Sequence, residues 1–316
     1  MQSKDNAVTA QAQQILGQIR RAVVGKDQTL LWVLSAVLAR GHILLEDIPG
    51  VGKTTMALAF SRVLDLDYSR VQFTPDVLPS DVTGYSIPDG EGQLRYQPGA
   101  VITNLFLADE LNRATSRTQS ALLEAMEEGQ VTVDGISHPL PQPFVVIATQ
   151  NPTGAAGTQL LPDSQMDRFM IRLSLGYPSP KDEMAMVRSR QGVNPLKELT
   201  AMMTRQELVQ LQDTVEQTYL SDSVVGYIVS LVGATRSSPD LNRGASPRAT
   251  LAVTAMAKAV ARLRGRDYVL PADVREVFAQ TVAHRLILSS RAEAQGKTAQ
   301  QVAKELLASV PSPKVR

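Results

Sequence analysis

A glycine-rich segment near residue 50 has the residue types and spacing of a phosphate-binding loop. The segment, Asp47-Ile48-Pro49-Gly50-Val51-Gly52-Lys53-Thr54, follows the apolar run Ile43-Leu44-Leu45. In such loops the glycines let backbone N–H groups converge on the phosphates, the lysine reaches the β and γ oxygens, and the hydroxyl helps to hold Mg²⁺. The segment predicts a nucleoside triphosphate site with Mg²⁺. The residues expected to contact the nucleotide are Pro49, Gly50, Val51, Gly52, Lys53, Thr54 and Thr55.

One position departs from the general pattern of these loops. The pattern G-x-x-x-x-G-K-[ST] has glycine where this chain has Asp47. Aspartate tolerates a left-handed backbone, and Pro49-Gly50 provides a turn of its own, so the departure weakens the pattern match more than the chemistry. For this segment considered alone, an ordinary strand, turn and helix is the alternative.

A second apolar run ends in two carboxylates, as a triphosphate site requires. The run Asn104-Leu105-Phe106-Leu107-Ala108 leads into Asp109-Glu110. Asp109 is expected to hold Mg²⁺ through water, and Glu110 to polarise the water that attacks the γ-phosphate. A strand that merely ends in acids is the alternative, and the phosphate loop upstream argues against it.

A polar amide follows the next apolar run, 144–149. Asn151 stands at the predicted strand end, and ligands of open α/β sheets bind outside the carboxyl ends of the strands. Asn151 is expected either to orient the attacking water or to contact the γ-phosphate. The alternative is an Asn-Pro turn with no chemical role.

Two arginines are candidates for contacts with phosphate. Arg168 begins the apolar run 169–175 and is expected to reach the triphosphate of a neighbouring subunit as an arginine finger. The alternative for Arg168 is an ion pair with Asp167 or another neighbour. Arg248 lies in the first turn of a helix that Ser246-Pro247 begins, where a cation is electrostatically unfavourable, so an anionic partner such as phosphate is expected.

The elements that must position these residues alternate between strands and helices. Apolar runs bounded by polar or turn residues indicate strands buried on both faces, as in a parallel sheet covered by helices. The predicted strands are 43–45, 68–73, 104–108, 144–149 and 169–175, and the predicted helices are 7–23, 28–39 and a helix from residue 53. Two segments, 83–98 and 130–139, each contain an Asp-Gly pair and are predicted to be β-hairpins that project from the sheet.

The chain is expected to change character near Pro178. Strand signals stop there, and helices are predicted to begin at Ser179 and at the capping box Thr204-Arg205-Gln206-Glu207. Further helices are predicted at 221–235, 247–264 and 271–283. We therefore predict a nucleotide-binding α/β domain at 1–178, an all-α lid domain at 179–310 and a disordered tail at 311–316.

Composition limits the classes of function. A length of 316 residues favours about two domains. Lys plus Arg total 32 against 31 for Asp plus Glu, so no global field attracts nucleic acid or an anionic membrane. The absence of cysteine excludes disulfides, thiolate zinc sites and cysteine nucleophiles, and it makes the cytoplasm the expected location. The apolar stretch 30–39 is shorter than the roughly 20 residues that span a bilayer, so no membrane insertion is expected.

Other titratable side chains receive less specific interpretations. The three histidines, His42, His138 and His284, have no ligand spacing, so metal binding by them is not expected. A solvated helix face is predicted for Glu124, Glu127 and Glu128, and solvated helix ends for Arg262, Arg264, Arg266, Arg285 and Arg291. Arg113 and Arg117 closely follow the acidic pair and are candidates to face a neighbouring subunit.

Six sequence blocks together resemble the MoxR family of AAA+ ATPases, over nearly the whole chain. They are LEDIPGVGKT (45–54), QFTPDVLPSDVTG (72–84), DELNRA (109–114), QSALLEAMEE (119–128), ATQNP (148–152) and LPDSQMDRF (161–169). Several of these blocks have no general phosphate-loop rationale, so their combination is specific. The resemblance implies an αβα nucleotide domain with a helical lid, assembled as a ring, usually a hexamer, with ATP between subunits. It also implies a chaperone-like remodeller whose ATP turnover matures client proteins, often with a von Willebrand factor A domain partner.

The same resemblance implies roles for single residues. Asn151 corresponds to sensor 1, Arg168 to the arginine finger and Arg248 to sensor 2, acting either in its own subunit or in the next. Val23, Val24 and Gly25 match the segment that borders adenine. Asp47 in the phosphate loop is usual in the family, and the two hairpins resemble inserts that reach toward the pore or the substrate in related ATPases.

Two other functions stay open at this point. A nucleic-acid-dependent ring motor is one, although the chain has no appended DNA-binding module and its charge is balanced. A scaffold that binds ATP without significant turnover is the other, and the intact Lys53, Asp109 and Glu110 argue against it.

Overall fold

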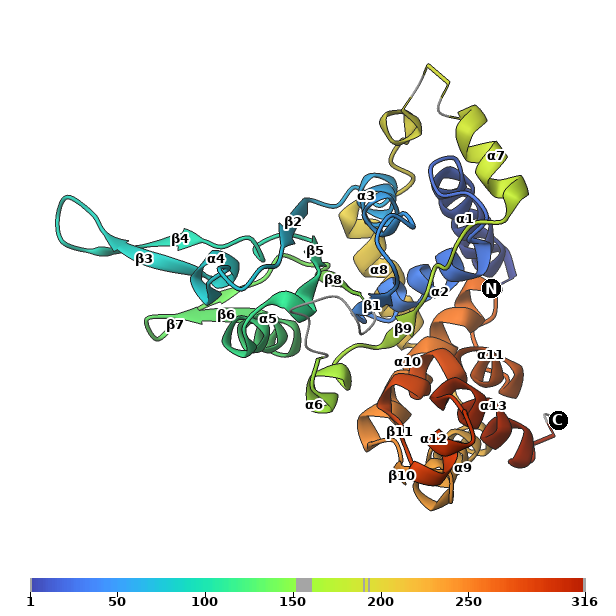
Figure 1. Cartoon of the computed structure of the whole chain (residues 1–316). Coiled ribbons are helices and arrows are strands. Elements are labelled where there is room, and N and C mark those ends of the chain that lie inside the picture. Colours follow the sequence, from blue (N-terminus) through green and yellow to red (C-terminus); the bar gives the residue numbers. More distant parts are fainter. Residues whose placement is uncertain (1, 152–160, 190, 193, 315–316) are drawn as a thin grey trace.

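Five parallel strands form the central sheet (Figure 1). The computed structural model describes residues 2–151, 161–189, 191–192 and 194–314. The strands lie in the order β2-β5-β8-β1-β9, and all four pairings are parallel, so their carboxyl ends share one edge. They are β1 (Ile43–Glu46), β2 (Tyr68–Gln72), β5 (Leu105–Asp109), β8 (Val145–Gln150) and β9 (Ile171–Leu173). The predicted parallel sheet is confirmed.

Helices cover both faces of the sheet, because successive residues of a strand point to opposite sides. Leu45 and Ile147 share one apolar core with three helices, α1 (Gln2–Arg20), α2 (Asp27–Leu38) and α3 (Lys53–Val63). Leu44 and Val146 face the other way, in a second core with α5 (Ser116–Glu128). Shorter helical segments lie beside the second core: α4 (Pro79–Thr83), α6 (Asp163–Met166) and the 3-10 turn Leu111–Arg113.

Two β-hairpins extend away from the sheet side by side, as predicted (Figure 1). They are β3 (Gly84–Pro88) with β4 (Leu94–Pro98), and β6 (Gln130–Val133) with β7 (Ile136–Pro139). The ring of Tyr96 on β4 stacks on the ring of His138 on β7, with centroids 3.7 Å apart and planes at 11°. This stack joins the two hairpins.

Beyond β9 the chain is mainly helical. The helices are α7 (Pro180–Ser189), α8 (Arg205–Glu216), α9 (Asp222–Ser237), α10 (Pro247–Leu263), α11 (Pro271–Val282), α12 (Ser290–Ala294) and α13 (Ala299–Ser309), with 3-10 turns at Pro195–Glu198 and Ala283–Arg285. The prediction of an all-α lid is wrong in one detail. Strands β10 (Leu241–Arg243) and β11 (Ile287–Leu288) form an antiparallel pair, and they are too short for an alternating pattern to reveal them.

The amino-terminal helices belong to the same core as the lid. Helix α10 packs against α1 and α2 as well as against α8, α9 and α11. Ile15, Leu34, Val253 and Met256 accordingly lie in one apolar cluster. The predicted boundary near Pro178 therefore follows the last strand of the sheet, but it does not coincide with a break in the core.

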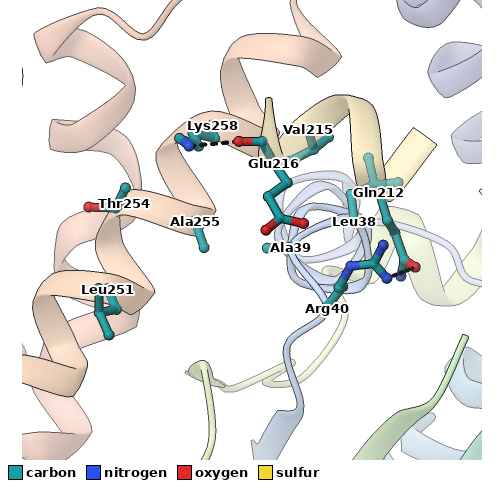
Figure 2. Close-up of a pocket in the computed structure, with 10 residues that line it drawn as sticks. All are labelled: Leu38, Ala39, Arg40, Gln212, Val215, Glu216, Leu251, Thr254, Ala255 and Lys258. Atoms are coloured by element: carbon teal, nitrogen blue, oxygen red, sulfur yellow. Dashed lines mark hydrogen bonds between the residues drawn. The ribbon is translucent and has the colours of Figure 1, made fainter. Parts of the chain in front are cut away.

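Helices α2, α8 and α10 leave a hollow of about 250 Å³ where they meet (Figure 2). Leu251 and Lys258 of α10 line it, and the Lys258 ammonium donates to the backbone carbonyl of Glu216.

In the described ranges, no helix is both long and apolar enough to cross a membrane. Residues 311–314 of the predicted tail have neither helix nor strand, and Pro152, Val315 and Arg316 lie outside the described residues.

Candidate nucleotide-binding site

The predicted phosphate loop joins β1 to α3 at the carboxyl edge of the sheet. Gly50 and Gly52 have φ of +86° and +97°, a region that favours glycine. Gly52 is the N-cap of α3, and no side chain caps that end of the helix. The first N–H groups of α3 are therefore available to an anion, and Thr54 and Thr55 lie in the same turn.

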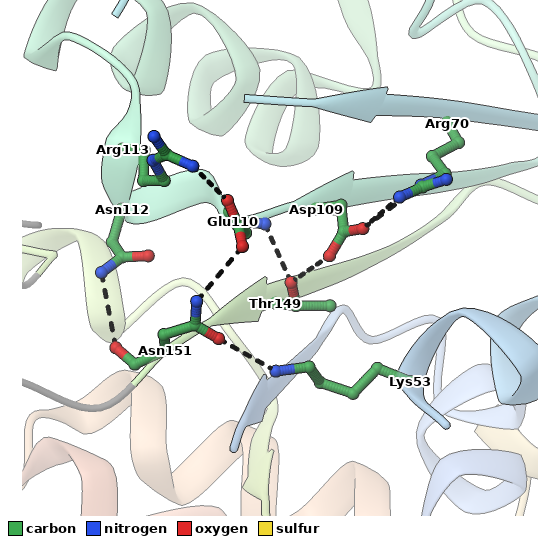
Figure 3. A network of polar contacts seen from close by, with 8 residues as sticks. All are labelled: Lys53, Arg70, Asp109, Glu110, Asn112, Arg113, Thr149 and Asn151. Carbon is green, nitrogen blue, oxygen red and sulfur yellow. Dashed lines mark hydrogen bonds and ion pairs between the residues drawn. The ribbon is translucent and has the colours of Figure 1, made fainter. Parts of the chain in front are cut away.

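Lys53 points back into the loop. Its side chain is buried, with 7% of the residue exposed, and its ammonium donates to the backbone carbonyl of Asp47 at 2.5 Å. It also donates to Oδ1 of Asn151 at 3.3 Å (Figure 3). Burial lowers the pKa of Lys53, and the charges of Asp47, Asp109 and Glu110 oppose that shift. The ammonium thus lies where β1 and β8 end side by side.

Asp109 is anchored from two sides. Thr149 donates its hydroxyl to Oδ1 of Asp109 at 2.6 Å, and Arg70 on β2 forms an ion pair with Oδ2 at 2.7 Å (Figure 3). The same Thr149 oxygen accepts the backbone N–H of Glu110 at 2.9 Å. Sequence reasoning missed Arg70 and Thr149. An arginine inside a predicted strand was the available signal for Arg70, but only the strand order brings it to Asp109.

Glu110 is held by two neighbours and by its own backbone. Its φ of 57° is a left-handed conformation that is uncommon for this residue type. Asn151 donates its amide to one carboxylate oxygen at 3.2 Å, and Arg113 pairs with the other at 2.8 Å. The side chain of Asn151 therefore bridges Lys53 and Glu110. Arg113, a candidate to face another subunit, is engaged with Glu110 of its own chain, whereas Arg117 is exposed on α5.

Comparison with known proteins identifies the family. Residues 42–171 match the model of the ATPase family associated with various cellular activities (AAA), and residues 233–306 match the AAA lid domain. The chain is 40% identical to Chaperone MoxR1 of Mycobacterium tuberculosis, over 94% of this chain and 81% of that protein. This chain is a MoxR-family AAA+ ATPase.

Two further similarities extend over nearly the whole chain. Identity is 43% with YeaC, an uncharacterised protein of Bacillus subtilis, over 93% of this chain and 92% of YeaC. The crystal structure of a candidate ATPase from Cytophaga hutchinsonii superposes with a TM-score of 0.89 at 35% identity. It covers 99% of this chain and 98% of that one.

In this MoxR-family chain, Arg168 and Arg248 lie together at the opposite edge of the sheet. Both pair with Glu127 of α5, Arg168 at 3.1 Å. A hollow of about 160 Å³ is lined by these three side chains with His42 and Met126. His42, which lines this hollow, precedes β1, and Asp47 follows β1. The five residue steps from His42 to Asp47 span roughly 16 Å at about 3.3 Å per residue, so the hollow with the two arginines lies about that far from the phosphate loop.

These contacts correct one interpretation and specify another. Glu127 is not only part of a solvated helix face, because α10 folds back and brings Arg248 to it. Of the two partners considered for an Arg168 ion pair, Asp167 or another neighbour, the structure has the second, Glu127. Sequence spacing along α5 shows that Glu127 faces outward, but it does not show that α10 lies opposite.

Arg285 is also not a solvated helix end. Its side chain is 3% exposed, forms an ion pair with Asp167 at 3.0 Å and donates to the Phe169 carbonyl at 2.6 Å. Burial lowers the pKa of Arg285 to about 10, and the charge of Asp167 opposes the shift. Ser246, the N-cap of α10, donates to the same Asp167 carboxylate at 2.9 Å. Arg285 and Ser246 thus fix the backbone that carries Arg168.

The segment expected to border adenine lies between α1 and α2. Val23 is buried, Val24 is half-buried and Gly25 has φ of +72°. The φ of Gly25 favours glycine, and a Cβ there would lie 2.3 Å from the Asp182 carboxylate of α7, which would have to move aside. Among the described residues, no cluster of His, Cys, Asp and Glu has the geometry of a metal site. His42 and His284 are buried, and burial lowers the pKa of both.

Proposed function

We propose that this protein binds ATP with Mg²⁺ and hydrolyses it at the cluster of Lys53, Asp109, Glu110 and Asn151. The observation that carries the proposal is the Asn151 amide, which contacts both the loop lysine and the acid expected to activate water. The carboxyl ends of β1, β5 and β8 thereby meet at one point. Phosphoryl transfer depends on groups that position the reactants and stabilise the charge on the phosphate, and this point brings such groups together.

The residues present suit ATP and Mg²⁺. The free N–H groups of α3 and the ammonium of Lys53 are donors for phosphate oxygens, and Thr54 with Asp109 supplies the hard oxygen ligands that Mg²⁺ prefers. When bound, Mg²⁺ neutralises charge on the phosphates. Lys53 then exchanges its contacts with Asp47 and Asn151 for phosphate, and Glu110 accepts a hydrogen bond from the attacking water and takes its proton.

We also propose that Arg168 and Arg248 both act on the nucleotide of a neighbouring subunit. They lie about a strand length from their own phosphate loop, and they share one carboxylate, so the pair keeps an excess positive charge. A head-to-tail contact that closes into a ring, here taken as a hexamer, would bring this edge against the next phosphate loop. This proposal places Arg248 in trans.

The purpose that ATP turnover serves in this protein is proposed from its similarity to a named relative. The relative named Chaperone MoxR1 supports a chaperone-like role in remodelling client proteins. A von Willebrand factor A domain protein is the proposed partner, and its binding is tested by capture on the hydrolysis-deficient protein described next.

Glu110→Gln tests the catalytic assignment. The amide keeps the size of the side chain but cannot accept the proton, so ATP binding is expected to persist while steady-state phosphate release falls by about 10² to 10⁴. Glu124→Gln on the exposed side of α5 is the matched control and is expected to leave both unchanged. Phosphate release retained in Glu110→Gln would contradict the role of Glu110.

A further inference from the structure

The linker between β9 and α7, residues 174–178, is fastened to the phosphate loop by Asp47. One oxygen of the Asp47 carboxylate accepts the Ser174 hydroxyl at 2.8 Å and the Gly176 N–H at 2.6 Å. The other oxygen accepts the N–H of Ile48 at 2.9 Å. Asp47 is 8% exposed, so these contacts are shielded from water. Glycine, which the general loop pattern has at this position, could make none of the side-chain bonds.

A lysine next to the expected adenine segment also holds this linker, through hydrogen bonds. The ammonium of Lys26 donates to three successive carbonyls, those of Leu175 at 2.5 Å, Gly176 at 3.2 Å and Tyr177 at 3.1 Å. Lys26 directly follows Val23-Val24-Gly25. Both segments that border the nucleotide site therefore hold the chain where it leaves the sheet.

Asp47 also holds the loop lysine, through its backbone. Its carbonyl accepts the ammonium of Lys53 at 2.5 Å, while its side chain holds Ser174 and Gly176. Phosphate oxygens would draw Lys53 away from this carbonyl, which changes the forces on the Asp47 peptide. The Asp47 carboxylate accepts hydrogen bonds directly from the linker, so a movement of the Asp47 peptide reaches residues 174–178 with no other residue between them.

We propose that Asp47 is a positioning residue that passes the nucleotide state of the phosphate loop to the lid through the linker 174–178. The proposal rests on the proposed ATP site. Gly176, with φ of +60°, supplies a backbone that bends at the point of attachment. Burial opposes ionisation of Asp47, but the hydrogen bonds from Gly176, Ser174 and Ile48 outweigh it and lower the pKa, so the carboxylate is charged at neutral pH.

The test is hydrogen exchange of the linker in the full-length protein, without nucleotide, with ADP, and with a non-hydrolysable ATP analogue and Mg²⁺. Asp47→Asn retains only one acceptor oxygen and cannot serve both Ile48 and the linker. The Gly176 amide is then expected to exchange at least about fivefold faster, and the dependence of exchange on nucleotide is expected to disappear. The kcat for ATP is expected to fall by about tenfold while KM changes by less than about threefold.

Two variants separate coupling from a local defect in the loop. Ser174→Ala removes one contact from the linker side and leaves the loop intact, so it is expected to shift exchange and kcat in the same direction by a smaller factor. Asp134→Asn, the same substitution at an exposed hairpin turn, is expected to match the wild type.

The inference is overturned if exchange in the wild-type linker does not respond to nucleotide. It is also overturned if Ser174→Ala is silent while Asp47→Asn raises KM, because Asp47 would then act only within the loop. A wild-type protein that binds no ATP would instead overturn the proposed function, so the two failures are distinguishable.

Discussion

Asn151 shows how one side chain serves two opposite charges. Its carbonyl oxygen accepts from Lys53 and its amino group donates to Glu110. A carboxamide carries an acceptor and a donor on one planar group, whereas an ionised aspartate at the same position could not donate to Glu110. The amide thus links the loop lysine to the acid.

Thr149→Val is expected to destabilise the protein and slow ATP turnover. The buried hydroxyl donates to Asp109 and accepts from Glu110, so its loss removes one of the two anchors of Asp109 and leaves the part-buried Glu110 N–H unpaired, at a cost of about 1–3 kcal/mol in the free energy of unfolding. Thr132→Val on exposed β6 is the control, and about 0.5 kcal/mol or less is expected. Equal unfolding free energies for the two variants, from denaturant titration, would contradict this role of Thr149.

His42 predicts a loss of stability in mild acid. Burial lowers its pKa from 6.5 to about 4, and the hydrogen bond to the Met126 carbonyl opposes the shift. Between these values the unfolded chain binds the proton and the folded protein does not, so stability falls as pH drops from about 6.5 to about 4, by up to roughly 3 kcal/mol.

The measurement is the free energy of unfolding against pH, for wild type and His42→Gln. The variant is expected to be less stable at pH 7, since the ring nitrogens bond Val146 and Met126, but to have a shallower slope between pH 6.5 and 4. Burial also lowers the pKa of His284, so part of the dependence of stability on pH remains in the variant. Identical slopes would remove His42 as a source of the pH dependence.

Among helices and strands, the turn from β1 into α3 is the most demanding in backbone conformation. Gly52→Ala is expected to cost about 1–2 kcal/mol of stability, because φ of +97° is strained for alanine even though no atom blocks its Cβ. ATP affinity is expected to fall as the N–H groups of the loop shift. Gly90→Ala in the β3–β4 turn has the same open surroundings without a left-handed φ, and its calorimetric melting temperature and ATP affinity should match the wild type.

The sequence predicts elements whose signals are local, and it misses contacts that depend on how the elements pack. The phosphate loop and the acid pair are each contained within about ten residues, so the strand and the residue that follows it could be predicted together. Arg70 meets Asp109 only because β2 lies beside β5. The interpretations of Glu127 and Arg285 fail for the same reason, since Glu127 meets Arg248, and Arg285 meets Asp167, across more than 100 residues of sequence.

At the scale of the whole molecule, mixing of variants tests the proposed ring and the site that its subunits are proposed to share. Lys53→Ala subunits are expected to lose ATP binding, and Arg168→Ala or Arg248→Ala subunits are expected to bind ATP without turning it over. Mixed rings should regain ATPase activity, because a Lys53→Ala subunit still offers both arginines to an intact phosphate loop next to it. Rates are measured against the mixing ratio at constant total protein.

The pattern of rescue separates the two arginines. If Arg168→Ala is rescued by Lys53→Ala and Arg248→Ala is not, Arg248 acts within its own subunit and the trans assignment fails for that residue. If neither is rescued, although each variant still forms rings with wild type, the site is complete within one chain. Two Lys53→Ala preparations mixed together serve as the control and are expected to stay inactive.

The stacked rings of Tyr96 and His138 connect the two hairpins to each other. Joined there, β3–β4 and β6–β7 form one arm whose outer turn lies at residues 89–93 and whose base continues into α5 at Gly129. Glu127 lies two residues before that base and holds Arg168 and Arg248. The carboxylate that pairs with both arginines therefore lies within one helical turn of the base of the arm.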